Sequence, residues 1–330
     1  MVNLPYPSQV AITGATGHLG SVLVPMMLRQ GFTLKCLYRK KIPALQHAQL
    51  SWIQGDLEKK MGVSELLEDT AVLIHCASLI SVGEEDPLEV HAVNVEGTAN
   101  IAEACAEKGV RLIYISSSVA AQDTGRHETM TEGTPWRTSG DFPYGLSKAR
   151  AEQLVLEAVA KKGLDALILR PSALIGPPDP RPSRFGATIW DLYAGKIPLI
   201  TSGGYNVLDI RDFAQTVINS MTLGRKGEIY LTGGEFHSLK EIAGLAGDRR
   251  VPPCLPIDLI ILLLPLIRLY DKCFKLRWPV TRESLITLKK APRRMDSSKA
   301  KREIQHKTRP LQESIADLLE WMKINQRDAS

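Results

Sequence analysis

Residues 13–20 read Thr-Gly-Ala-Thr-Gly-His-Leu-Gly. They lie between a short apolar run, Val10–Ile12, and a helix-like stretch, Ser21–Arg29. Glycines between a strand and a helix permit a tight turn and let the backbone approach a pyrophosphate, which the N–H groups and dipole of the helix then stabilise. A turn spaced Gly-x-x-Gly-x-x-Gly can also occur without a ligand, but this position favours a dinucleotide site. The residues expected to contact the dinucleotide are Gly14, Thr16, Gly17, His18, Leu19 and Gly20.

Beyond this turn, short apolar runs continue to alternate with helix-like stretches. Further strands are expected at Leu34–Tyr38, Ala71–Ile74, Arg111–Ile115 and Ala166–Leu169, and helices at Asn94–Lys108 and Tyr144–Lys162. Gly109 and Gly163 follow these helices and can end them. Strands joined by helices make right-handed crossovers, so the pattern predicts an α/β fold with a Rossmann-type doubly wound parallel sheet of six or seven strands.

The length and the second half of the chain indicate two units. At roughly 150 residues per domain, 330 residues make about two domains. After Pro171 the regular alternation stops, and prolines crowd residues 177–182. We expect a dinucleotide-binding domain over residues 1–170, extended by parts of 205–235. Residues 171–330 are expected to form mostly a smaller substrate-binding lobe, interleaved with the first domain, over the C-terminal edge of the sheet.

The composition is that of an ordinary globular chain, with 44% hydrophobic and 23% charged residues, and it excludes a disordered or collagen-like protein. Five scattered cysteines without a Cys-x-x-Cys pair disfavour a disulfide framework and a zinc ribbon. Seven histidines show no metal-ligand spacing, so no metal site is expected. Residues 1–5 lack the basic start and long apolar stretch of an export signal, and we expect a cytoplasmic protein.

Basic residues are concentrated near the C-terminal end. The formal net charge is +5, and residues 289–309 alone carry nine Lys or Arg against two acids, a local +7. Such a segment can attract nucleic acid or anionic lipid, although a solvated surface explains it as well. Because the aromatic side chains needed for base stacking are not interleaved there, nucleic acid is not an expected partner.

The run Leu259–Ile267 is nine apolar residues long, whereas a membrane-spanning helix needs about 20. It could instead lie at a membrane surface, because Lys272, Lys275, Arg277 and the basic segment follow it. Packing within the substrate lobe, or at the contact of a homodimer, is the favoured alternative.

Tyr144 and Lys148 are four residues apart at the start of an expected helix, so their side chains project from one face. A phenol with a pKa of about 10 is a poor acid–base catalyst at neutral pH, but a nearby ammonium and an oxidised nicotinamide both favour phenolate. Such a pair also occurs by chance on helix surfaces. Ser116-Ser117-Ser118 closes the strand expected at 111–115, where a hydroxyl could hold a substrate oxygen or merely begin a turn.

The residues after the second expected strand bear on the choice of nucleotide. An acidic side chain about 20 residues past the glycines would accept a hydrogen bond from the ribose of NAD. Here Arg39 stands nineteen residues after Gly20, and Lys40 follows it. Two cations would attract a 2′-phosphate, which predicts NADP(H) over NAD(H); the alternative is a solvated basic turn.

Several further segments complete a recognisable set. In the first half they are the glycine turn, Asp56-Leu57, Asn94–Thr98, the serine triplet and Tyr144–Lys148. In the second half they are Arg170–Ser172 with Gly176-Pro177, Leu208–Ala214 and Asp296–Ala300. The set resembles the extended short-chain dehydrogenase/reductase family, NAD-dependent epimerase/dehydratase type, and within it the dihydroflavonol-4-reductase-like members. The resemblance covers nearly the whole chain and is weakest over residues 236–294.

The resemblance implies roles for individual residues. Tyr144 would be the acid–base, Lys148 its electrostatic partner and a ribose ligand, and Ser118 the hydroxyl beside the substrate oxygen. Ser117 remains an alternative to Ser118, and Asn94 would be structural, fastening its helix to a strand. The other implied cofactor contacts are Asp56 at the adenine amine, Leu57 against its ring, Ala77 beside the ribose and Pro171 near the nicotinamide.

Members of this family differ in their chemistry. Sugar 4,6-dehydratases carry an Asp-Glu pair just after the catalytic hydroxyl, where this chain has Val119-Ala120. Sugar epimerases usually have an acid at the end of the second strand, where Arg39 stands. The sequence therefore predicts an NADPH-dependent oxidoreductase that reduces a ketone or aldehyde on a hydrophobic or medium-sized small molecule, with the proton from Tyr144. The alternatives are an NAD-dependent nucleotide-sugar epimerase and a non-catalytic dinucleotide-binding protein. Aromatic residues that could line the substrate pocket, or equally pack in a core, are Phe185, Trp190 and Tyr193.

Overall fold

The fold is seen in a computed structural model of the chain, which describes residues 9–81, 85–140, 142–247, 250–274 and 281–327. Three features used in the sequence predictions lie outside the described residues. They are the N-terminal residues 1–5, the side chain of Lys272, and the cations Lys275 and Arg277.

Seven parallel strands form the central sheet, in the order β11-β7-β5-β4-β1-β2-β3. Their bounds are β1 (Gln9–Thr13), β2 (Thr33–Tyr38), β3 (Leu50–Gln54), β4 (Val72–His75), β5 (Arg111–Ile115), β7 (Ala166–Pro171) and β11 (Ile229–Thr232). β4 and β7 are buried along their whole length, as strands covered on both faces must be. The predicted doubly wound sheet is confirmed, and every expected strand lies within two residues of its predicted bounds.

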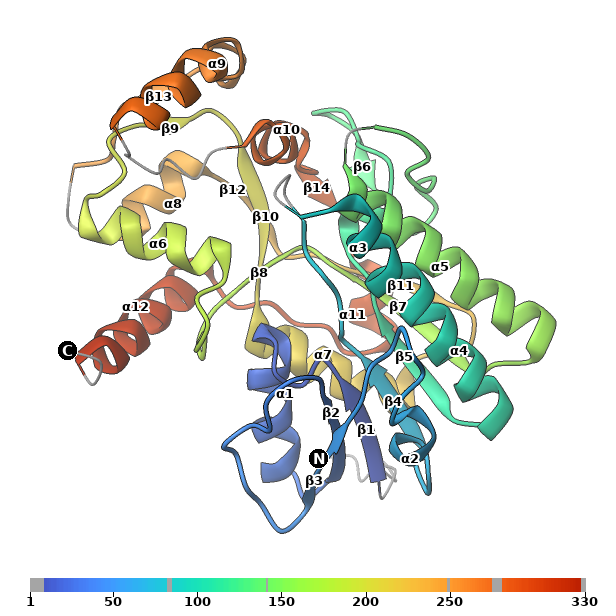
Figure 1. The fold of residues 1–330 in the computed structure, drawn as a ribbon. Coiled ribbons are helices and arrows are strands. Elements are labelled where there is room, and N and C mark those ends of the chain that lie inside the picture. The colour runs from blue at the N-terminus through green and yellow to red at the C-terminus, as the bar shows by residue number, and fades with distance from the viewer. Residues whose placement is uncertain (1–8, 82–84, 141, 248–249, 275–280, 328–330) are drawn as a thin grey trace.

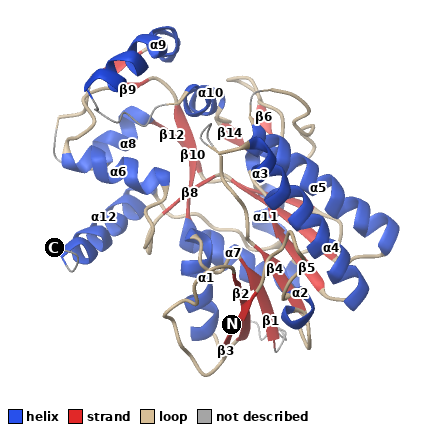
Figure 2. Cartoon of the chain, viewed as in Figure 1, coloured by secondary structure: helices blue, strands red, loops and turns tan. Residues whose placement is uncertain are grey.

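Helices cover both faces of this sheet (Figures 1 and 2). On one face lie α1 (His18–Arg29) and α7 (Ile210–Leu223); on the other lie α2 (Val63–Leu66), α4 (Gly97–Lys108) and α5 (Pro143–Lys162). Strand side chains alternate between the two cores: Val10 and Ile12 pack with α1 and α7, whereas Ala11 faces α4. α4 begins three residues later than expected, because a π-helical turn (Ala92–Glu96) joins it to α3 (Pro87–His91).

A smaller lobe is built on a three-stranded sheet, in which β10 (Gly204–Asp209) pairs with parallel β8 (Ala173–Ile175) and antiparallel β12 (Glu235–Ser238). The helices around it are α6 (Arg184–Ala194), α8 (Leu239–Leu245) and α12 (Leu311–Arg327). Their shared core includes Phe185, Trp190 and Tyr193, so core packing accounts for these three aromatic residues. The stretch 205–235 contributes α7 and β11 to the large sheet layer, while the domain boundary at residue 170 stays a prediction.

The outer end of the lobe consists of two packed helices and short strands (Figure 1). These elements are β9 (Ile200–Thr201), β13 (Cys254–Leu255), α9 (Ile257–Phe274) and α10 (Arg282–Lys290). From there the chain returns through β14 (Arg294–Met295), which pairs with β6 (Thr129–Met130), and continues into α11 (Ser298–Glu303). The expected apolar run lies within α9. Across the part of the chain that the structure describes, we find no helix with the length and apolarity that crossing a membrane requires.

Candidate active site

The sheet topology brings the predicted site residues to one edge. Pro171, Ser117, Ala77, Gly14 and Arg39 come at or just after the C-terminal ends of β7, β5, β4, β1 and β2, which are neighbours in the sheet. The strand order reverses beside β1, because the chain passes from β1 to β2 on one side and later to β4 on the other. Ligands of open α/β sheets bind in the crevice at such a switch point.

At two glycines of the turn, neighbouring backbone lies so close that it leaves no room for a side chain. Gly14 has a φ of +72°, and a Cβ there would lie 2.5 Å from the backbone nitrogen of Ala77 at the end of β4. A Cβ on Gly20 would lie 2.4 Å from the carbonyl carbon of Ala15. No larger residue fits at either position without a shift of backbone.

The first turn of α1 offers its N–H groups to a ligand. Gly17 is the N-cap residue, and no side chain caps the helix. Gly17 itself is exposed, and its N–H donates to the carbonyl of Gly14 at 3.0 Å. An uncapped helix N-terminus behind a glycine cradle suits a pyrophosphate, because donors and helix dipole both favour negative charge.

His18 makes a tertiary contact that the sequence did not indicate. Its Nε2 lies 3.0 Å from the carbonyl oxygen of Gly176 and 3.8 Å from a carboxylate oxygen of Asp179. The hydroxyl of Ser21 also donates to the carbonyl of Pro178 at 3.3 Å. The glycine turn is therefore fastened to the loop after β8, at the junction of the two sheets.

The other residues predicted at the nucleotide end have different environments. Arg39 and Lys40 are exposed at the end of β2, beside the glycine turn. Asp56 uses Oδ1 to accept the N–H of Glu58 at 3.0 Å. Leu57 is a buried core residue, and its side chain would be 3.3 Å from a Cβ placed on Gly97. Their roles toward a cofactor stay predictions.

Tyr144 lies in the first turn of α5, close to two serine hydroxyls. Burial raises the pKa of Tyr144 to about 12, although hydrogen bonds with the side chains of Ser78 and Ser117 act in the opposite direction. Ser118 begins the short 3₁₀ turn Ser118–Ala120 and is not among these partners. Within the serine triplet, Ser117 is the residue whose side chain hydrogen-bonds the phenol, while the choice between Ser117 and Ser118 as the catalytic hydroxyl stays a prediction. Ser78 is a second partner of the phenol that no sequence motif had marked.

Lys148 is buried, and its ammonium hydrogen-bonds β5 and lies over the ring of Tyr144. Its Nζ donates to the carbonyl of Ile115 at 2.9 Å and lies 5.9 Å from the centre of the Tyr144 ring. Burial lowers the pKa of Lys148 to about 8, while the charge of Glu152 acts to raise it. Burial is the largest influence on the pKa of Tyr144 in this structure, and the effect of the ammonium together with an oxidised nicotinamide stays a prediction.

Asn94 holds the surroundings of Tyr144 in place. Its side-chain oxygen accepts from the Ser78 hydroxyl at 3.0 Å and from the Leu79 N–H at 2.8 Å. Its amide donates to the Ser147 hydroxyl at 3.0 Å, and Ser147 in turn donates to the carbonyl of Tyr144 at 2.8 Å. The contacts agree with a structural role, but they fasten the loop after β4 and α5 rather than a strand.

A second group of hydrogen-bonded polar side chains is buried near Lys148. His75 contacts the hydroxyl of Thr13 through Nδ1 at 2.6 Å and that of Thr98 through Nε2 at 3.0 Å. Burial lowers the pKa of His75 to about 3, so the ring is neutral. Burial also raises the pKa of the neighbouring Cys76 thiol to about 12, which removes Cys76 as a nucleophile at neutral pH.

A fully buried ion pair joins α5 to β7. Arg170 is 1% exposed and Glu152 is 0% exposed, and Nη2 of the arginine lies 2.6 Å from Oε2 of the glutamate. The indole N–H of Trp136 donates to the same oxygen at 2.7 Å. Glu152 is eight residues after Tyr144, a little over two helical turns, so the pair sets the position of the helix that carries the phenol.

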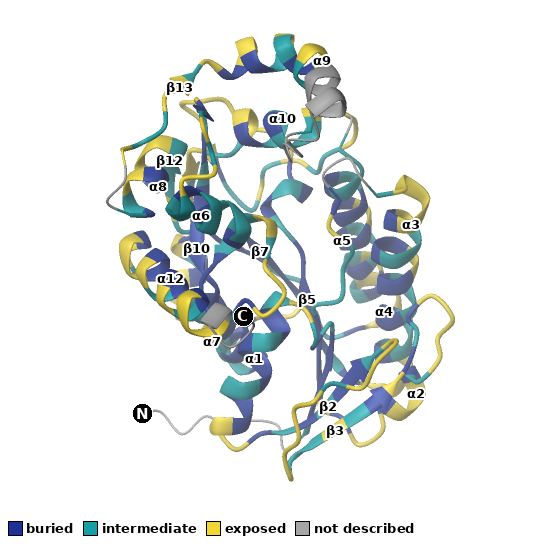
Figure 3. Ribbon diagram, turned by 60° about the vertical axis from the view of Figure 1, so that its left-hand side comes forward, coloured by how far each residue is buried: buried dark blue, intermediate teal, exposed yellow. Residues whose placement is uncertain are grey.

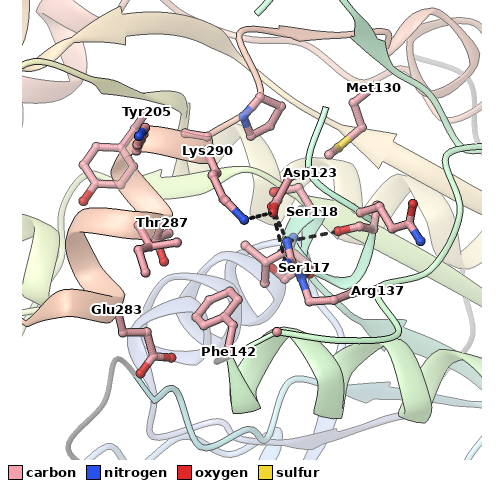
Figure 4. A pocket seen from close by; sticks show the side chains of 18 of the residues that line it. Ser117, Ser118, Asp123, Met130, Arg137, Phe142, Tyr205, Glu283, Thr287 and Lys290 are labelled. Atoms are coloured by element: carbon pink, nitrogen blue, oxygen red, sulfur yellow. Dashed lines mark hydrogen bonds and ion pairs between the residues drawn. The ribbon is translucent and has the colours of Figure 1, made fainter. Parts of the chain in front are cut away.

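A cleft with a volume of about 880 Å³ opens at the two serines. Ser117, Ser118 and Phe142 lie on one side of it, and Tyr205, Glu283 and Thr287 face them from the lobe (Figure 4). The walls therefore come from the loop after β5, from β10 and from α10. This volume is within the range of sites for small organic ligands.

Asp123 links the two walls of the cleft. It pairs with Arg137 on its own loop and, at 3.0 Å, with Lys290 on α10 (Figure 4). Burial acts to raise the pKa of Asp123, but the hydrogen bonds from both cations hold it below its ordinary value. Lys289, also at the cleft, pairs with Asp258 of α9.

Comparisons with known proteins agree with this architecture. The sequence profile of the NAD dependent epimerase/dehydratase family matches residues 10–233. "Sterol demethylase protein B" of Methylococcus capsulatus is 31% identical over 326 residues, covering 94% of this chain and 97% of the relative. A "putative dihydroflavonol 4-reductase" of Synechocystis is 30% identical over 329 residues, covering 94% of each. The crystal structure of gox2253 superposes with a TM-score of 0.82 at 30% identity, covering 97% of this chain and 99% of that one.

Proposed function

Because the chain belongs to the NAD dependent epimerase/dehydratase family, whose profile matches residues 10–233, we propose that it is an NADPH-dependent reductase of a ketone or aldehyde. When bound, the nicotinamide supplies the hydride. The observation that carries the proposal is the hydrogen bond between the side chains of Tyr144 and Ser117, because Ser117 lines the cleft and burial raises the pKa of the phenol to about 12. A protonated phenol is what the reductive direction requires.

The residues present fit a dinucleotide. Gly14 and Gly20 form a cradle that any Cβ would fill, and this cradle suits the pyrophosphate. The uncapped N-terminus of α1 suits it as well. We assign Asp56 to the adenine end and Lys148 to the ribose next to the nicotinamide. Arg39 is assigned to a 2′-phosphate, because an exposed cation follows β2 where NAD-binding members need an acid.

The chain's own groups then move one proton. The Ser117 hydroxyl donates to the substrate carbonyl oxygen and positions it beside the phenol. With a pKa of about 12, Tyr144 is protonated at neutral pH and can give its proton to that oxygen as negative charge develops there. Lys148, with a pKa of about 8, is mostly charged at neutral pH and stabilises the phenolate that remains.

The reaction is tested by incubating the protein with NADPH and a panel of aldehydes and ketones. We expect NADPH to be consumed mole for mole with the alcohol formed. Interconversion of isomers without net consumption of NADPH would assign the protein to the epimerases instead.

Ser117→Ala is expected to lower kcat for the best carbonyl of that panel by about 10²-fold, because it removes a donor to the developing oxyanion. Ser118→Ala serves as the matched control, since Ser118 lines the same cleft but is not a partner of Tyr144. The kcat of Ser118→Ala is expected to stay close to that of the wild type. A larger loss in Ser118→Ala than in Ser117→Ala would return the oxyanion role to Ser118.

Arg39→Ala is expected to raise the KM for NADPH by roughly 10- to 150-fold, the range of a lost hydrogen bond between charged groups. The KM for NADH should change little, because NADH has no 2′-phosphate. Lys41→Ala is the control, an exposed cation two residues further along the same turn. Wild-type protein that binds NADH more tightly than NADPH would contradict the assignment of Arg39.

A further inference from the structure

α9 has two faces with different environments. Ile257, Ile260 and Leu264 are buried and pack against α10. On the other side Leu259, Leu262 and Leu266 are 40%, 74% and 63% exposed. Spacings of three and four residues put these leucines on one helix face, which we call the leucine face. Figure 3 shows α9 at the outer end of the lobe, with exposed and buried residues alternating along it.

Three leucines on one exposed face call for an explanation. Single exposed apolar residues are normal on protein surfaces, but a contiguous apolar face marks an interaction site. A helix that merely covers a core would carry polar residues on its outer side. Here Pro265 and Leu266 are exposed next to each other, and the apolar run continues around the helix.

The stretch of sequence that includes the leucine face is basic. Residues 257–294 carry nine Lys or Arg against three acids, a formal +6, so the rest of the chain, at 5 minus 6, is close to neutral. On α10, the helix that packs against α9, Lys289 and Lys290 are paired with Asp258 and Asp123, whereas Arg293 and Arg294 just beyond it are exposed. A second copy of this chain meeting face to face would bring like charges together, whereas anionic headgroups would neutralise them.

The same helix reaches the cleft. Asp258 and Ile261 of α9 line it, next to Ile286 of α10. The helix that carries the leucine face therefore also borders the proposed substrate site. An apolar helix face flanked by cations is the arrangement by which interfacial helices bind a bilayer surface without crossing it.

The charges at the cleft favour an uncharged substrate. Arg137 and Lys290 share Asp123, and Lys289 pairs with Asp258. Cations already paired with carboxylates of the same chain are poor partners for a diphosphate, whose binding would have to break those pairs. An uncharged carbonyl compound has no such requirement, and one whose surface is mostly apolar partitions into lipid.

We propose that α9 docks on the surface of an anionic lipid bilayer through its leucine face, and that the cleft takes up an uncharged carbonyl compound from that bilayer. The docking stands on the exposed leucines and the charge of residues 257–294. The uptake of substrate rests on the proposed function. The two parts can therefore fail separately.

Docking is tested by co-sedimentation of the full-length protein with phosphatidylcholine vesicles that contain phosphatidylglycerol. The double variant Leu262→Gln/Leu266→Gln is expected to lower the vesicle partition coefficient by at least about tenfold, because two leucines no longer enter the interface. Leu88→Gln is the control, a 77% exposed leucine on α3. It should bind as wild type does. Binding of the wild type should also fall on pure phosphatidylcholine and at high salt.

Two results would overturn the docking. One is no sedimentation of the wild type with anionic vesicles. The other is a wild-type dimer in light scattering that the double variant abolishes, which would show that a second copy covers the leucine face. The substitutions lie on exposed positions, so unchanged thermal denaturation should show that the variant is folded.

Activity measurements distinguish a failure of the docking from a failure of the proposed function. With a water-soluble carbonyl substrate, the double variant should keep the wild-type kcat/KM. With a carbonyl substrate carried in anionic vesicles, its kcat/KM should fall in proportion to its lost binding. If the double variant and the wild type reduced the vesicle-borne substrate at equal rates, the proposal that the cleft takes up its substrate from the bilayer would be wrong. A protein that binds vesicles but reduces no carbonyl would contradict the proposed function and leave the docking in place.

Discussion

Replacing Tyr144 with phenylalanine is expected to lower kcat for carbonyl reduction by about 10²- to 10⁴-fold, the usual contribution of a general acid. The phenol is the proposed proton donor, and burial keeps it protonated with a pKa of about 12. Phenylalanine keeps the aromatic ring, whose centre lies 6.2 Å from the centre of the Phe142 ring, and removes only the hydroxyl. The affinity for NADPH, measured by fluorescence titration, should change by less than a few-fold.

Tyr205→Phe is the matched control for this experiment. Tyr205 lines the cleft, and burial raises the pKa of its phenol to about 12 as it does for Tyr144, but Tyr205 lies on β10, on the wall opposite Ser117. Its hydroxyl has no proposed part in proton transfer, so turnover should stay near wild type. Full activity in Tyr144→Phe, or an equal loss in both variants, would remove Tyr144 from the mechanism.

Glu152→Gln is expected to lower the free energy of unfolding by about 3–5 kcal/mol, because it leaves the Arg170 guanidinium buried without a countercharge. Arg170 is 1% exposed, so solvent cannot replace the lost carboxylate. The amide keeps the size of the side chain, and the effect therefore reports on charge rather than on a cavity. The measurement is urea denaturation followed by circular dichroism.

Glu157→Gln on the same helix provides the comparison. Glu157 pairs with Lys161 at 2.6 Å on the surface of α5, where exposed ion pairs contribute little. Its denaturation midpoint should equal that of wild type. If Glu152→Gln were also indistinguishable from wild type, the ion pair would not be what holds α5 on β7. The charge of Glu152 also acts to raise the pKa of Lys148, so its loss should make that amine easier to deprotonate.

Much of the nucleotide end could be predicted from local sequence. A glycine turn between a strand and a helix has few alternative structures, and the close approach of Gly14 to the end of β4 shows why no larger residue stands there. The strands β1, β2, β4, β5 and β7 were predictable because each is a short apolar run between helices. Parallel strands then place their C-terminal residues at one edge without further information.

The choice between neighbouring hydroxyls could not be predicted in the same way. A serine triplet after a strand shows that hydroxyls reach the edge of the sheet, but not which one faces α5. In the structure Ser117 has extended backbone just before the 3₁₀ turn Ser118–Ala120, and its side chain hydrogen-bonds Tyr144. Ser78 follows β4 without a motif, and only the fold brings it to the phenol. The pKa of Tyr144 likewise depends on how deeply α5 packs, which composition and spacing do not contain.

The substrate cleft was the least predictable part, because its walls are far apart in the sequence. Asp123 after β5 and Lys290 on α10 are separated by 167 positions, yet they form an ion pair across the cleft. Pocket lining and core packing were both open for three aromatic residues, and in the structure they pack against the core of the lobe: Phe185, Trp190 and Tyr193. Sequence periodicity shows that an apolar side chain faces inward. Whether it then contacts a ligand or packs in a core depends on how the elements of the lobe pack together.

Following the hydride itself gives the sharpest test of the reductase proposal. The protein is supplied with a reducible carbonyl compound and, in separate reactions, with each of the two NADPH diastereomers deuterated at C4. The proposal predicts that one of them transfers its deuterium to the former carbonyl carbon, one per alcohol formed, while the hydroxyl proton comes from solvent. Product without deuterium from either cofactor, or isomerised substrate with the label still in the cofactor, would contradict it.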